Sequence, residues 1–171
     1  MEIYDPKKIL VPVDFSGLSK GVLRTGVEIG EIRDLEVTAL HVAKEPTPRI
    51  QYGVYGEGLA PTFPASKFRE DTRMKLESRL ELMVKEVSAG PKVKPVVLWG
   101  EPTQEILRHA ESGDFDLIVL GTHGHKGLSR FLLGSVAERV IRRAPCPVFV
   151  FREKVATKRL EQMTMEQAAM N

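Results

Sequence analysis

Length, composition and charge exclude several classes of protein. The chain has 171 residues, 42% hydrophobic and 28% charged, which suits one globular domain with a sizeable core and excludes wholesale disorder, collagen-like repeats and a disulfide scaffold. Lys and Arg total 25 against 23 Asp and Glu, and a net charge of +2 is too near neutral to indicate a nucleic-acid-binding protein, so any anionic ligand must be bound by local groups.

The start of the chain indicates neither export nor membrane insertion. Residues 1–6 contain no basic segment followed by an apolar one, and no run of 18 apolar residues occurs anywhere. We therefore expect a cytoplasmic protein without a membrane partner.

Short β-rich runs alternate with stretches of helical periodicity along the chain. The predicted strands are residues 8–13, 37–42, 93–99, 116–120 and 147–151. The predicted helices are one containing Leu18, Val22 and Ile29, one with apolar residues at helical spacing from Leu76 to Val87, and two over residues 102–111 and 135–143. Strict alternation of strand and helix predicts βαβ units in an α/β fold with a parallel sheet.

The character of each strand predicts its place in the sheet. The first and fourth runs are almost continuously apolar, as in central strands covered on both faces, whereas Lys94 and Pro95 suit an edge strand. We predict an open five-stranded parallel sheet of order 3-2-1-4-5, with helices on both faces. This order reverses direction between strands 1 and 4, so a ligand is expected at the segments after Val13 and Leu120.

Two segments resist regular assignment. Residues 44–65 are rich in Pro and Gly and are predicted to be a flexible insertion, with a functional lid as the alternative. Residues 153–171 are polar with few apolar positions and are expected to form a C-terminal tail outside a domain of residues 1–152. Cys146 is the single cysteine; it excludes intrachain disulfides and is better explained by packing at the start of a strand than by thiol chemistry.

A glycine-rich segment joins the fourth strand to the last helix. Its order from Gly121 through Gly124 to Gly134 and Ser135 is G-x2-G-x9-G-S. Glycines allow the backbone to approach a ligand closely, and the first-turn amides of a helix favour a phosphate. Taken alone, Ser135 is better explained as the N-cap of its helix, because residues 135–138 read Ser-Val-Ala-Glu, a capping-box pattern.

The whole set of motifs resembles the universal stress protein (UspA-like) family, in its ATP-binding branch. The resemblance rests on the glycine segment together with Pro12-Val13-Asp14 and Pro145-Cys146-Pro147-Val148, and it covers about residues 6–152. It implies a Rossmann-like sheet of the same order, ATP as the ligand with Mg²⁺ or Mn²⁺ on its phosphates, no metal ligands from protein side chains, and a homodimer paired through the last strand, residues 147–151, with higher oligomers left open. The last strand is the expected second edge of the sheet, and an apolar edge is normally covered.

The resemblance also implies roles for individual residues. The implied set is Pro12, Val13, Asp14 and Val42 around adenine and ribose, Leu120 and Gly121 beneath the ribose, and Gly124, Gly134, Ser135 and Val136 around the phosphates. Many relatives have methionine at the position of Leu120, a change of little volume. Asp14 has two explanations, an N-cap for a helix beginning near Ser16 or a contact with the nucleoside, and the glycine segment favours the second.

Several other chemistries are not indicated. The sequence contains no P-loop pattern G-x4-G-K-S/T and no G-x-G-x-x-G after the first strand. Residues 122–125 read Thr-His-Gly-His, like the T-x-G-H signature of nucleotidylyl transferases, but they follow the fourth strand rather than the first. His123 and His125 are better explained as solvated loop residues than as metal ligands, since no carboxylate neighbours them.

The function predicted from these observations is regulatory. We expect an ATP-binding universal stress protein with a signalling role in the stress response, and no catalytic residues. The alternatives are a nucleotide-independent interaction module of the same fold and a slow ATPase, although no residue is evidently placed to orient a water molecule. The physiological stress, the protein partner and the preference among ATP, ADP and AMP are not encoded in recognisable motifs.

Overall fold

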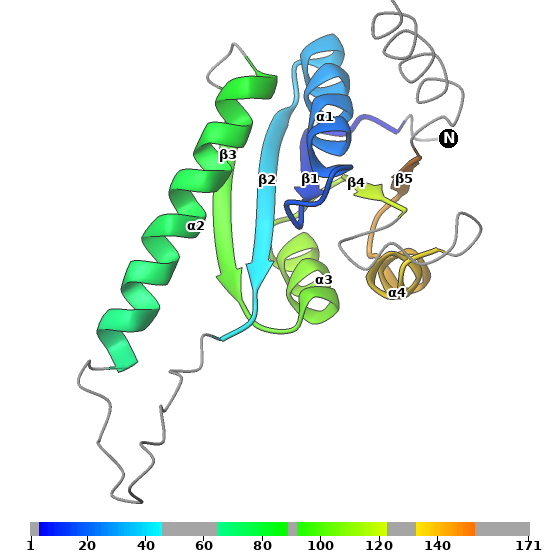
Figure 1. Ribbon diagram of the computed structural model, residues 1–171. Helices are drawn as coiled ribbons and strands as arrows, with labels where there is room; N and C mark the ends of the chain where they lie inside the picture. Colours follow the sequence, from blue (N-terminus) through cyan, green and yellow to red (C-terminus); the bar gives the residue numbers. More distant parts are fainter. Residues whose placement is uncertain (1–3, 46–64, 89–91, 123–132, 153–171) are drawn as a thin grey trace, which may run out of the picture.

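The computed structural model describes residues 4–45, 65–88, 92–122 and 133–152, in which strands and helices alternate strictly (Figure 1). The elements are β1 (Lys8–Pro12), α1 (Ser19–Arg33), β2 (Glu36–Ala43), α2 (Ala65–Val87), β3 (Val93–Trp99), α3 (Pro102–Ser112), β4 (Leu117–Gly121), α4 (Ser135–Arg143) and β5 (Val148–Phe151). All five predicted strands are present. Residue 65, assigned to the insertion from the sequence, is the first residue of α2; the rest of the insertion from 46 to 64 and the predicted tail lie outside the described residues.

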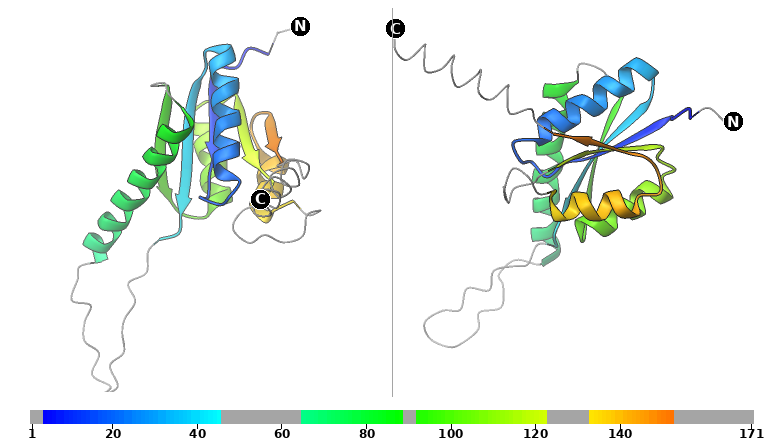
Figure 2. Two further views of the ribbon diagram at one scale, coloured as in Figure 1. Left: turned by 45° about the horizontal axis from the view of Figure 1, so that its top comes forward. Right: turned by 90° about the vertical axis from the view of Figure 1, so that its right-hand side faces the viewer.

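The sheet has the predicted order β3-β2-β1-β4-β5, and every neighbouring pair of strands is parallel. Helices α1 and α2 cover one face and α3 and α4 the other (Figures 1 and 2). Pro95 lies on the edge strand β3, where its missing N–H is tolerated. The chain therefore leaves the neighbouring strands β1 and β4 toward opposite faces of the sheet, which opens the crevice expected at a switch point.

Two hydrophobic cores enclose the sheet, because the side chains of a strand alternate between its faces. Ile9 and Val11 of β1 belong to the core beneath α1 and α2, and Leu10 belongs to the core above α3 and α4; all three side chains are fully buried. Helix α1 packs very close to the sheet at Gly26, where a Cβ atom would lie 2.5 Å from Cγ2 of Val11. Glycine is required there by the close approach of the backbone.

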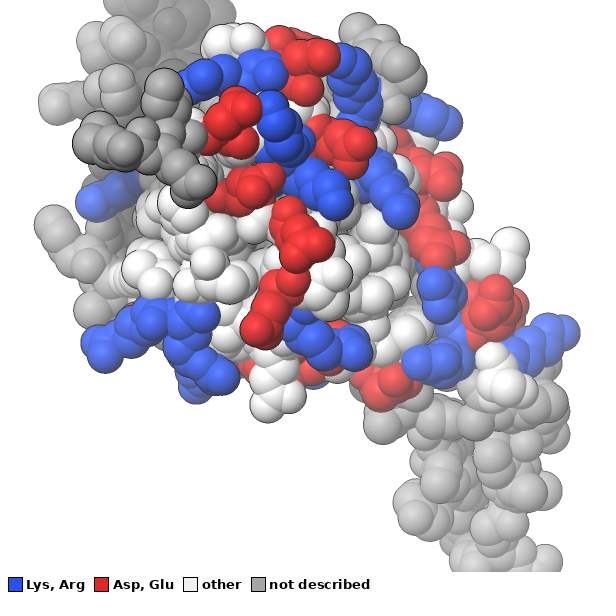
Figure 3. Space-filling model, turned by 180° about the vertical axis from the view of Figure 1, so that it is seen from behind, with Lys and Arg blue, Asp and Glu red and all other residues white. Residues whose placement is uncertain are grey.

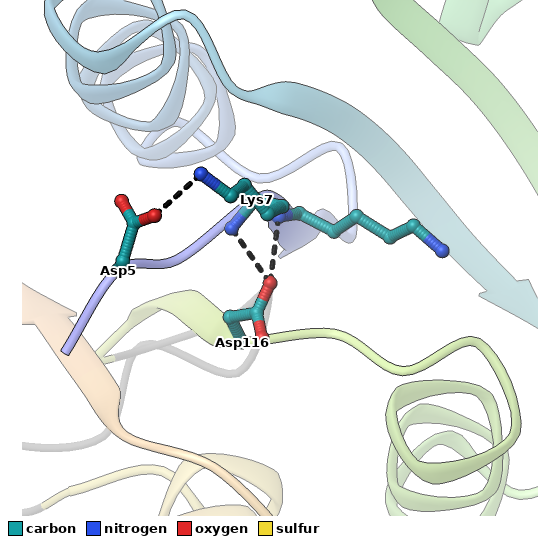
Figure 4. A network of polar contacts seen from close by, with 4 residues as sticks. Asp5, Lys7 and Asp116 are labelled. Carbon is teal, nitrogen blue, oxygen red and sulfur yellow. Dashed lines mark hydrogen bonds and ion pairs between the residues drawn. The ribbon is translucent and has the colours of Figure 1, made fainter. Parts of the chain in front are cut away.

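A network of hydrogen bonds to carboxylates joins the amino ends of β1 and β4, at the edge of the sheet opposite the crevice (Figure 4). Oδ2 of Asp116 accepts hydrogen bonds from the backbone N–H groups of Lys7 (2.7 Å) and Lys8 (2.9 Å), and Lys7 Nζ lies 2.5 Å from Oδ2 of Asp5. Asp116 directly precedes β4, Lys7 directly precedes β1, and Lys8 is the first residue of β1. These bonds fix the alignment of β1 with β4, and hence the relative position of their carboxyl ends.

None of the described helices combines the length and apolar character needed to span a bilayer.

Candidate functional site

A cavity of about 760 Å³ opens at the carboxyl ends of β1 and β4, within the size range of small-molecule sites. Nine of the ten residues implied by the family resemblance line it, namely Pro12, Val13, Asp14, Val42, Leu120, Gly121, Gly134, Ser135 and Val136. The tenth, Gly124, lies outside the described residues, as do His123 and His125. Segments far apart in the sequence thus meet at the place that the strand order predicts.

The floor of the cavity is apolar. Leu40 of β2 and Leu120 of β4 are buried beneath it, and Ile106 of α3 and Ala137 of α4 close its side. An apolar surface of this kind suits a planar ring, because it removes the ring faces from water without leaving polar groups unpaired.

Asp14 lines the cavity in the loop between β1 and α1, but it does not cap the helix. Its Oδ1 accepts hydrogen bonds from the backbone N–H of Ser16 and from Oγ of Ser19, both at 3.0 Å. Ser19 Oγ in turn accepts from the Asp14 N–H at 3.3 Å. The N-cap of α1 is Leu18, because the helix begins only at Ser19, and the N-cap explanation of Asp14 is therefore wrong.

The same correction applies to Ser135. The N-cap residue of α4 is Gly134, in an extended conformation (φ −63°, ψ 148°), and Ser135 is already the first helical residue, so it cannot take the N-cap position of a capping box. Gly134 N–H donates to the carbonyl oxygen of Thr122 at 2.7 Å, which ties the start of α4 to the end of β4. The first-turn amides of α4 have no intrahelical acceptor, and two of the residues that carry them, Ser135 and Val136, line the cavity.

Three charged residues at the cavity were not predicted as site residues from the sequence. Lys44 follows β2, Glu101 is the N-cap of α3, and Glu138 lies in the first turn of α4. Burial would raise the pKa of Glu101, but hydrogen bonds from the backbone N–H of Gln104 and from Thr103, with the positive charge of Arg139 4.0 Å away, lower it overall. Glu101 is therefore ionised at neutral pH, and its position before Pro102, a first-turn proline, was the signal that could have revealed this cap.

Three further titratable side chains of the described residues lie away from the cavity. His41, His109 and Cys146 are absent from the cavity wall. Burial, with the charge of Asp116, raises the pKa of the Cys146 thiol, which keeps it protonated at neutral pH and supports the packing explanation. Within residues 4–45, 65–88, 92–122 and 133–152, no group of three His, Cys, Asp or Glu side chains is arranged to hold a metal ion.

Surface charge on the side of the molecule opposite to that in Figure 1 is mixed. Acidic and basic side chains are interspersed over its upper part and right side, uncharged side chains fill much of its middle, and one small group of basic side chains lies at the lower left (Figure 3). An anionic ligand is therefore not attracted by a broad basic field on that side, and the cavity's own donors must provide the affinity.

Comparison with known proteins places the chain in a family. The model of the universal stress protein family matches residues 6–152. The universal stress protein MJ0531 of Methanocaldococcus jannaschii is 37% identical over 147 residues, covering 86% of this chain and 82% of that protein.

Two solved structures extend the similarity to the fold. The structure of MJ0577 from Methanocaldococcus jannaschii has 32% sequence identity and a TM-score of 0.66, covering 88% of this chain and 98% of that one. A universal stress protein from Archaeoglobus fulgidus, solved in complex with dAMP, has 25% identity and a TM-score of 0.55, covering 86% and 99% of the two chains. With the family match spanning most of its length, this chain belongs to the universal stress protein family.

Proposed function

We propose that this protein binds ATP in the cavity between β1 and β4 and acts as a regulatory protein in the stress response. The observation that carries the proposal is the meeting of an apolar floor with the first-turn amides of α4 in one cavity. The first element suits a purine ring, and the second suits phosphate oxygens. The complex of the Archaeoglobus fulgidus relative with dAMP supports an adenine nucleotide as the ligand class.

The two ends of the nucleotide are assigned to different segments of the cavity wall. Val13, Asp14 and Val42 are assigned to adenine and ribose, and the segment Gly134–Val136 to the phosphates. A divalent cation, Mg²⁺ or Mn²⁺, would be held by the phosphates, since the described residues offer no three-residue cluster for it. The cation would neutralise phosphate charge, while the chain itself contributes backbone donors and shape.

We also propose that two copies pair through β5. This strand is the edge of the sheet beside β4, and Phe149 and Val150 expose 45% and 38% of their surface. An exposed apolar edge with unpaired backbone groups is normally covered, and pairing of two β5 strands across a two-fold axis would cover both copies at once.

Calorimetric titration with Mg-ATP tests the nucleotide proposal. Gly134→Val should weaken binding about tenfold or more, because it places a branched side chain at the cavity wall and overpacking costs about 1–3 kcal/mol. The φ of Gly134 is −63°, so valine is tolerated by the backbone and the effect comes from the side chain. Ser135→Ala should cost less, about 0.5–1.5 kcal/mol, because the amide remains.

Ser112→Val is the control for adding a branched side chain, because Ser112 is an exposed residue at the end of α3 and does not line the cavity. It should bind as the wild type does. Equal affinity of the folded Gly134→Val and wild-type proteins would place the nucleotide elsewhere. A wild type that binds no nucleotide would favour the nucleotide-independent interaction module.

A further inference from the structure

The loop that lines the cavity after β1 contains a strained residue. Phe15 has a φ of 60°, in the left-handed region that a bulky side chain rarely adopts, and its side chain is buried, with 8% of the residue exposed. Such a conformation is energetically unfavourable for this residue type and persists only where the surroundings hold it in place. Val13 and Asp14, directly before it, both line the cavity.

Two residues from other elements hold Phe15 in this position. The His41 ring of β2 lies 4.2 Å from the Phe15 ring, centroid to centroid, and is tilted by 39°. The guanidinium carbon of Arg79 in α2 lies 4.2 Å from the centroid of the same ring. His41 Nδ1 also lies 2.8 Å from the carbonyl oxygen of Val13; because a carbonyl can only accept, Nδ1 carries the proton and donates.

None of these three side chains lines the cavity. Phe15 belongs instead to the core between the sheet and helices α1 and α2. His41 acts on the Val13 carbonyl directly, and Arg79 acts through the Phe15 ring. We propose that His41 and Arg79 are positioning residues for nucleotide binding, which hold the loop in the conformation that presents Val13 and Asp14 to the ligand.

This inference rests on the proposed function, and it predicts a defined effect on affinity. When only a fraction of the molecules has the binding-competent loop conformation, the apparent Kd equals the intrinsic Kd divided by that fraction. Arg79 is exposed overall, and an exposed cation–π contact contributes about 0.5–1 kcal/mol, equal to a factor of about two to five. Removing the guanidinium should therefore weaken nucleotide binding severalfold without unfolding the protein.

The test compares Arg79→Gln with Arg73→Gln. Both arginines lie on α2, but Arg73 pairs with Glu77 on the same helix, at 2.8 Å, and serves as the control for loss of one surface charge. Mg-ATP affinity is measured by calorimetry, thermal unfolding is recorded for each variant, and the ring proton shifts of His41 are followed by NMR without nucleotide. Arg79→Lys retains a cation and should recover part of the loss.

We expect Arg79→Gln to weaken Mg-ATP binding about two- to fivefold and to move the His41 ring shifts, with Arg73→Gln changing neither. If the wild type binds Mg-ATP and Arg79→Gln binds it equally well, the positioning role is overturned. If the wild type does not bind, the proposed function fails, and unmoved His41 shifts in Arg79→Gln would then overturn the positioning role on their own.

Discussion

The two serines beside Asp14 provide a sharp test of how the β1–α1 loop is built. Ser19 is 2% exposed, and its Oγ donates to Asp14 Oδ1 at 3.0 Å and accepts from the Asp14 N–H at 3.3 Å. Ser16 is half-buried at the cavity wall, and its Oγ is shielded from solvent but has no hydrogen-bond partner among the described residues. The two hydroxyls therefore differ chiefly in their hydrogen-bond partners.

Ser19→Ala removes two hydrogen bonds, each contributing about 0.5–1.5 kcal/mol, so we expect a loss of about 1–3 kcal/mol in the free energy of unfolding. For a chain of this length, each kcal/mol corresponds to about 2–4 °C in Tm. Ser16→Ala removes a buried hydroxyl without a partner and should be neutral or slightly stabilising. Mg-ATP affinity should also fall in Ser19→Ala, because Asp14 then loses a contact that fixes its carboxylate.

Urea unfolding followed by circular dichroism measures both variants, and calorimetry measures their affinities. Equal destabilisation by Ser16→Ala and Ser19→Ala would refute the assignment of the hydrogen bonds around Asp14. Retained Mg-ATP affinity in a folded but destabilised Ser19→Ala would show that Asp14 holds the loop together without contacting the nucleotide.

Three further predictions concern packing, assembly and pH. Gly26→Val should destabilise the fold by about 1–3 kcal/mol in urea unfolding, because its Cβ meets Val11 at 2.5 Å, and stability equal to the wild type would contradict that close approach. Val150→Pro should convert a dimer into a monomer by light scattering, since proline removes an edge-strand donor, and a wild-type protein that is already monomeric would end the dimer proposal. Burial, aided by the charges of Lys94 and Arg108, lowers the pKa of His109 below 6.5, so the unfolded chain binds more protons just below that pH. Stability should therefore fall as the pH drops below about 6.5, less steeply in His109→Gln; equal pH dependence of the two proteins in urea unfolding would show that His109 is not responsible.

The strand order of the sheet could be predicted because the residue composition of each strand depends on whether the strand is central or at an edge. The apolar run of residues 9–11 needs cover on both faces, which only a central strand has, and Pro95 needs an edge. Because strands and helices alternate strictly, few strand orders were compatible with these constraints. The observed order places the cavity at the carboxyl ends of β1 and β4. The resemblance to a family supplied the individual residues of its wall.

The local details of the site could not be predicted, because they depend on contacts between distant segments. The pattern from Ser135 to Glu138 fits a capping box, yet the helix begins one residue earlier than that pattern requires, with Gly134 bonded to the end of β4. The left-handed conformation of Phe15 depends on His41 and Arg79, which belong to two other elements. No local pattern around residue 15 encodes them.

The central claim is that an adenine nucleotide occupies the cavity between β1 and β4. Titration of the full chain with Mg-ATP, followed by backbone amide NMR, tests both whether the nucleotide binds and where it binds. The account predicts saturable shifts at the amides of Val13, Gly134, Ser135 and Val136, which come from two distant segments of the sequence and line one cavity. Saturable shifts confined to residues outside this cavity, or no shifts at millimolar nucleotide, would contradict it.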